Sequence, residues 1–122
     1  MTSNLSQFIK FLKEEISENQ ISSALTIDVI DPRDRLENKS EICVKPKNTQ
    51  EISKILKLAN KFIIPIIPIG GSTGLVGGQI APQSNHVTLS LEKLDTINFF
   101  KDSKLLYVQS GAILSNIKKL AF

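Results

Sequence analysis

The sequence predicts an α+β fold in which a small mixed sheet is flanked by helices. Two stretches, residues 4–19 and 49–62, repeat apolar residues at helical spacing. Short apolar or alternating runs lie between and after them, and the last two runs flank the polar turn KDSK, as in an antiparallel hairpin. Mixed helices and strands that include a hairpin favour an α+β arrangement.

The amino-terminal part is expected to form one helix followed by a linker. Residues 4–19 fit an amphipathic helix, whereas residues 20–40 are less regular. The polar segment DPRDRLENKS favours turns, because a residue before proline, here Asp31, avoids the helical conformation. We therefore divide the chain into residues 1–40 and 41–122. The apolar face of the first helix comprises Leu5, Phe8, Ile9, Leu12 and Ile16.

The best-defined element is a helix over residues 49–62. It follows a short strand, EICVKP, that ends at Pro46. Asn48 is placed to cap the helix, and Glu51 is placed to reach back as in a capping box. The expected apolar stripe comprises Ile52, Ile55, Leu56, Ala59 and Phe62.

The remaining elements are shorter. The run IIPIIPI cannot extend the helix, because Pro65 and Pro68 lack an amide donor, and it predicts an extended segment with incomplete pairing. HVTLSL predicts a strand, and TINFF and LLYVQSG predict the hairpin. A last helix is outlined by Ile113, Leu114, Ile117 and Leu120.

Composition excludes several classes of protein. The chain has 122 residues, 41% of them hydrophobic, which is typical of one globular domain. The net charge of +3 is mild, and without tryptophan or a basic stripe we expect no nucleic-acid binding. No apolar run approaches a membrane span of about 20 residues. The amino terminus matches neither a secretory signal nor a transit peptide, so we expect a cytoplasmic protein.

The reactive side chains indicate no catalytic or metal site. Cys43 is the only cysteine, so no internal disulfide can form, and we expect a buried, inert thiol. His86 is the only histidine and is most simply a surface residue. No cluster has metal-ligand spacing, and His86 has no evident partners for a Ser-His-Asp set.

The loop GGSTGLVGGQ holds five of the six glycines, at positions 70, 71, 74, 77 and 78. One or two glycines would suffice for a tight surface turn. Successive amides without Cβ atoms form concave anion sites, so the pattern favours a ligand that carries phosphate. The spacing matches neither a Rossmann fingerprint nor a Walker A loop.

Several motifs together resemble a known family. PIGGSTGLVGGQIAP, VTLSLEKLDTI, LLYVQSGAILSNI and the upstream VKPKNTQEISKILKLANKFIIPIIP are similar to the amino-terminal part of the FAD-binding domain of vanillyl-alcohol oxidase type flavoproteins, the PCMH-type domain. The subgroup that they resemble comprises D-lactate, glycolate and D-2-hydroxyglutarate dehydrogenases. The resemblance covers about residues 40–122, so residues 41–122 are expected to form the first half of such a domain.

The resemblance implies residue roles. The loop would bind the FAD diphosphate with its amides and hydroxyls, and a glycine pair would let the chain turn back against the cofactor. Non-covalent FAD is expected, because Gly71 and Ser72 stand where some relatives attach flavin through a histidine. The diphosphate loop is Ile69, Gly70, Gly71, Ser72, Thr73 and Gly74; the pair is Gly77 and Gly78; and Ser90 matches a strand end near the cofactor.

The resemblance also implies hydride transfer from a 2-hydroxy acid to the flavin in a protein several times longer. Three hypotheses about the function of the chain stay open. The chain is the flavin-binding portion of a 2-hydroxy-acid oxidoreductase, completed by the missing carboxy-terminal part as a separate chain and binding FAD only with it. Alternatively it is a standalone nucleotide-phosphate-binding module, or a truncated, catalytically inactive remnant.

Overall fold

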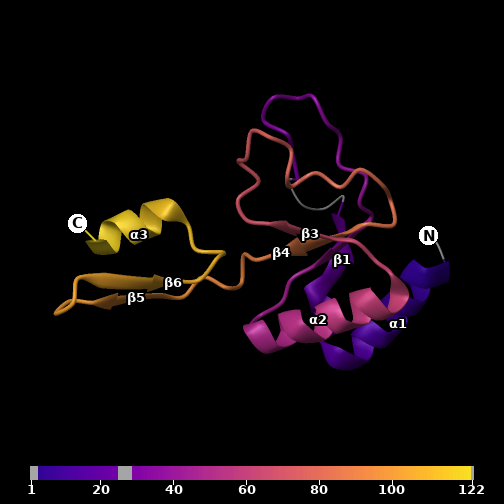
Figure 1. Cartoon of the computed structure of the whole chain (residues 1–122), viewed down its shortest axis with the longest axis horizontal. Helices are drawn as coiled ribbons and strands as arrows, with labels where there is room; N and C mark the ends of the chain where they lie inside the picture. Colours follow the sequence, from indigo (N-terminus) through magenta and orange to yellow (C-terminus); the bar gives the residue numbers. More distant parts are fainter. Residues whose placement is uncertain (1–2, 25–28, 122) are drawn as a thin grey trace.

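The computed structural model describes residues 3–24 and 29–121, and its mixed helices and small sheets confirm the α+β prediction (Figure 1). Residues 25–28, part of the predicted irregular segment, lie outside the described residues. The elements in order are α1 (Ser3–Glu15), a 3₁₀ turn (Glu18–Gln20), β1 (Ile21–Ser23), β2 (Ile42–Val44), α2 (Thr49–Phe62), β3 (Ile66–Ile69), β4 (Val87–Ser90), β5 (Ile97–Phe100), β6 (Leu105–Val108) and α3 (Leu114–Ala121).

The main sheet has four strands in the order β1-β2-β4-β3. β4 lies at its centre, pairs in parallel with β2 and β3, and has all four residues buried. β3 is an edge strand, which confirms the predicted incomplete pairing and explains how Pro68 is accommodated. β1 pairs antiparallel with β2.

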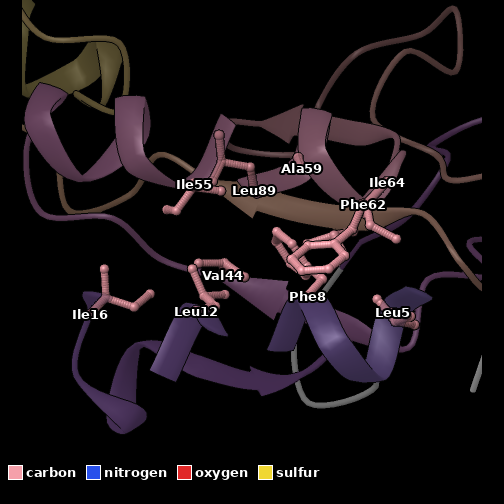
Figure 2. Close-up of a cluster of buried hydrophobic side chains, with 11 residues drawn as sticks. Leu5, Phe8, Leu12, Ile16, Val44, Ile55, Ala59, Phe62, Ile64 and Leu89 are labelled. Atoms are coloured by element: carbon pink, nitrogen blue, oxygen red, sulfur yellow. The ribbon is translucent and has the colours of Figure 1, made fainter. Parts of the chain in front are cut away.

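α1 and α2 pack together against the main sheet and share its core (Figure 2). The predicted face of α1 is buried at Leu5, Phe8 and Leu12, and Ile16 is buried just beyond the helix. Val44 and Leu89 meet these side chains from the strands. The division at residue 40 stays a prediction, although α1 belongs to the same core as residues beyond that point.

The predicted helix over residues 4–19 is too long, since α1 ends at Glu15. The Gln20 side chain accepts a hydrogen bond from the Ser17 amide at 3.1 Å, which supports a separate 3₁₀ turn. Gln20 is buried and also donates to the Lys45 carbonyl and to Glu51 Oε2. This side chain therefore ties the end of the first helical region to the start of α2.

The bounds of α2 agree with the predicted residues 49–62, and Asn48 Oδ1 accepts the Glu51 amide at 2.8 Å as a cap. Two details were wrong. Glu51 reaches back to the amide of Lys47, at 2.7 Å, instead of that of Asn48. Leu56 is exposed, and Leu58 packs against the core in its place.

The last elements of the chain, from β5 to α3, form a separate layer. β5 and β6 make the predicted antiparallel hairpin, and α3 lies over it, away from the main sheet (Figure 1). The predicted last helix is present, but none of its described residues is buried. Apolar side chains of this layer, including Phe100 and Leu105, are therefore exposed.

Candidate functional site

The glycine loop leaves the main sheet at the carboxyl ends of two parallel strands. Ile69, the last residue of β3, is buried and pairs with Ser90, the last residue of β4. The Leu91 amide then donates to the Ile69 carbonyl at 3.0 Å. Parallel pairing thus brings together two predicted site positions that lie 21 residues apart. The carboxyl ends of parallel strands are where open sheets with helices on them commonly bind ligands.

A cleft of about 680 Å³ opens between the start of the glycine loop and the start of α3. Its size lies within the usual range for a small-molecule site. Three of the predicted site residues line it. The lining residues are Gly70, Gly71 and Thr73 from the loop, Glu92 and Asp95 after β4, and residues 110–116.

The second half of the loop faces elsewhere. Gly77 lines a separate cavity of about 450 Å³, together with Arg35 and Lys39. Gly74, Gly78 and the buried Ser90 do not line the larger cleft among the described residues. The structure therefore places three predicted site residues in the larger cleft and one in the second cavity, and the other five line neither of the two.

Among the loop glycines, only Gly77 has a backbone conformation that favours glycine, although a Cβ at Gly74 would lie 3.0 Å from Gln79 Oε1. Gly77 has φ of +80°, and a Cβ there would lie 2.5 Å from Leu36 Cδ1. A Cβ at Gly70 or Gly78 would meet nothing within 4 Å, and at Gly71 only Thr73 Cγ2 at 3.9 Å. Glycine at 70 and 71 therefore keeps open the space beside the backbone in the cleft, as close approach of a bulky anion requires.

The Ser72 hydroxyl is already engaged within the protein. Its oxygen accepts the Ile30 amide at 3.0 Å, and it donates to the Ile30 carbonyl at 3.1 Å. A serine hydroxyl carries one hydrogen, so in this arrangement it has none left to donate to a phosphate oxygen. Ser72 can contribute its amide, and its φ of +57° sets the bend of the loop.

The start of α3 supplies further donors on the opposite wall. The Ile113 carbonyl accepts the amides of Asn116 and Ile117, which marks the first helical turn. Amides at the beginning of a helix, here those of Leu114 and Ser115, have no partner in the helix and favour anions. We did not predict from the sequence that residues 110–116 belong to the site.

Acidic side chains in the cleft offset the positive partial charge of these amides. Glu92 and Asp95 line the cleft, and Glu92 forms an ion pair with Lys45, with Nζ and Oε1 2.6 Å apart. The Glu92 carboxylate raises the pKa of Lys45, so the ammonium group of Lys45 stays protonated at neutral pH. Lys45 thereby offsets the charge of one of the two carboxylates.

The remaining reactive groups lie outside the cleft. Cys43 is fully buried, and burial raises the pKa of its thiol, which confirms the expected inert cysteine. His86 was expected at the surface but is half-buried, with Nδ1 shielded from solvent. Within the described ranges, no three potential His, Cys, Asp or Glu ligands gather as a metal site, and no helix is long and apolar enough to cross a membrane.

Comparisons with known proteins show the family to which the chain belongs. Residues 40–121 match the family described as FAD binding domain. The chain is 37% identical over 81 residues to a D-lactate dehydrogenase of Archaeoglobus fulgidus, covering 66% of this chain and 18% of that protein. It is 30% identical over 124 aligned positions to the mitochondrial D-2-hydroxyglutarate dehydrogenase of Arabidopsis thaliana, covering 92% and 21%.

The fold is also found in solved structures. A Phl p 4 variant, a glucose dehydrogenase, superposes with a TM-score of 0.81 over 93% of this chain and 26% of that chain, at 15% identity. The chain spans about a fifth of the length of the curated relatives described above.

Proposed function

This chain belongs to the FAD binding domain family, and we propose that the start of its glycine loop holds the pyrophosphate of FAD without a covalent bond. The observation that carries the proposal is the space beside Gly70 and Gly71, where glycine is not required by the fold. Backbone amides on both walls of one cleft can hold a diphosphate without a lysine.

The proposed roles differ along the loop. Gly70, Gly71 and Thr73 line the cleft and would contact the diphosphate directly. Ile69 anchors the loop to the sheet, and Ser72 and Gly74 shape it and offer amides. Gly77 and Gly78 turn the chain back. Ser90 accepts the Glu92 amide at 3.5 Å, so its proposed part is to hold the neighbouring turn.

We propose that the complete enzyme oxidises a 2-hydroxy acid, such as D-lactate, glycolate or D-2-hydroxyglutarate. The names of the relatives support this class of substrate. Bound FAD supplies the acceptor for a hydride, while the residues of this chain bind and orient its diphosphate.

We further propose that the carboxy-terminal part of the enzyme completes the site. The exposed apolar side chains of the hairpin and α3, such as Leu105 and Leu114, support a covering partner. FAD binding is then expected only with that part supplied. A standalone phosphate-binding module would instead bind FAD, ADP and pyrophosphate alone, which equilibrium dialysis distinguishes.

The experiment replaces Gly71 by valine. The new side chain meets little protein, so the fold should survive, but it would occupy the proposed diphosphate space. Ser84→Val adds a similar side chain to another exposed loop and serves as the control. With the carboxy-terminal part supplied, flavin fluorescence should show at least a tenfold loss of FAD affinity in Gly71→Val alone. Equal affinity in both variants would contradict the proposal.

A further inference from the structure

The glycine loop is held from outside by one short segment, residues 30–36, which we name the clamp segment. Ser72 and Ile30 exchange two hydrogen bonds, as described above. The Gln79 side-chain amide donates to the carbonyls of Ile30 and Gly74, both at 2.9 Å. These contacts fix the start and the end of the loop to the same residue of the clamp segment.

An arginine holds the middle of the loop. Arg35 Nη2 donates to the Leu75 carbonyl at 2.7 Å, while its Nε lies 3.5 Å from Asp31 Oδ2. The planar guanidinium therefore contacts a carboxylate and a loop carbonyl at once, which a lysine ammonium cannot do in the same geometry. Next to it, Leu36 packs so closely on Gly77 that it leaves no room for a Cβ.

Asp31 organises the clamp segment itself. Its side chain is buried, and its carboxylate oxygens accept the amides of Arg33 and Arg35 at 3.1 Å and of Leu36 at 3.2 Å. The carboxylate thus closes the turn that aims Arg35 at the loop. A loop so rich in glycine would otherwise sample many conformations.

We propose that Asp31 and Arg35 are positioning residues that hold the glycine loop in the conformation that binds the diphosphate. The inference rests on the proposed function of the loop but uses residues outside the cleft. If loss of the clamp lowers the population of the binding conformation to a tenth, the apparent Kd for FAD rises tenfold.

The test compares Arg35→Met with Arg33→Met. Both remove one positive charge from the same exposed turn, but among the described residues only the Arg35 side chain bonds to the glycine loop. Arg35 is about half exposed, so its loss removes no core packing. Arg35→Lys serves as a second variant, which keeps the charge and loses the double contact.

The first measurement is the ¹⁵N order parameter of the amides of Gly74, Leu75 and Gly77 in the free chain. We expect values near 0.85 in the unmodified protein and in Arg33→Met, and below about 0.6 in Arg35→Met and Arg35→Lys. Unchanged order parameters in both Arg35 variants would overturn the proposal that Arg35 holds the glycine loop.

The second measurement is FAD affinity with the carboxy-terminal part supplied. Arg35→Met should weaken binding about tenfold, and Arg33→Met should not. A mobile loop with full FAD affinity would overturn the positioning role. If the unmodified protein has a rigid loop but binds no FAD, the proposed function is contradicted. Lower order parameters in the Arg35 variants would then still support the role of Arg35 in holding the loop.

Discussion

Replacing Gly111 by alanine should detach the hairpin layer from the main sheet. A Cβ at this position would lie 1.7 Å from the Leu91 carbonyl oxygen and 2.9 Å from that of Leu94. A carbon approaches a carbonyl oxygen to about 3.3 Å, so the two backbones must separate by about 1.6 Å. That movement breaks the hydrogen bond from the Gly111 amide to Leu94, now 2.8 Å long.

The expected cost is about 2–4 kcal/mol, since overpacking costs about 1–3 kcal/mol and the one lost hydrogen bond about 1 kcal/mol. Gly78→Ala is the matched control, because its Cβ meets nothing within 4 Å and its φ is not positive. That change should be neutral or stabilise by under about 1 kcal/mol.

Urea unfolding followed by fluorescence of Tyr107 is the assay. This residue is the only tyrosine, tryptophan is absent, and it lies on β6 within the hairpin. At about 1.5 kcal/mol per molar urea, the midpoint of Gly111→Ala should fall by about 1.3–2.7 M. Coinciding curves for Gly111→Ala and Gly78→Ala would refute the close approach of these backbones.

Two further predictions concern the main core and its acid sensitivity. Phe8→Ala should destabilise the fold by about 3–5 kcal/mol by far-UV circular dichroism, because Phe8 is fully buried, whereas the exposed Phe100→Ala should cost under about 1 kcal/mol. Burial opposes ionisation of Glu51, but hydrogen bonds from the Lys47 amide and Gln20 outweigh it and lower the pKa of Glu51. The stability that ionised Glu51 contributes is therefore fully present above the pKa of about 4.3 that this group has in the unfolded chain. It is lost as the pH falls through the lower pKa of the folded chain. Glu51→Gln should thus flatten the acid side of the stability profile, and a profile no flatter than that of the exposed Glu14→Gln would contradict this.

Much of the fold follows from local signals in the sequence. Both ends of α2 were predicted because Asn48 caps its start and proline follows its end. The hairpin was predicted because a polar turn separates two apolar runs. In both cases, residues adjacent in sequence determine the structure.

The parts that were missed depend on distant partners. β1 contains two serines and no alternation, and it forms a strand because β2 offers a free edge. The end of α1 is set by Gln20, whose side chain also bonds to Lys45 and Glu51. Neither contact has a periodic signal in the sequence.

In the candidate site, too, the features set by neighbouring residues could be predicted and those set by distant partners could not. The glycine pattern marked Gly70 and Gly71, but the opposite wall of the cleft lies 40 residues further along the chain. One local signal was present there, since Gly111 stands two residues before the predicted last helix. The engagement of the Ser72 hydroxyl by Ile30 could not be predicted, because nothing in the sequence links these two residues.

Glycine-selective ¹⁵N labelling tests directly whether the loop binds the cofactor. The chain has six glycines and therefore six amide signals. On titration with FAD in the presence of the carboxy-terminal part, the signals of Gly70 and Gly71 should shift most and saturate with flavin binding, and that of Gly77 should shift least. Saturable flavin binding that leaves the Gly70 and Gly71 signals in place would show that the diphosphate binds elsewhere.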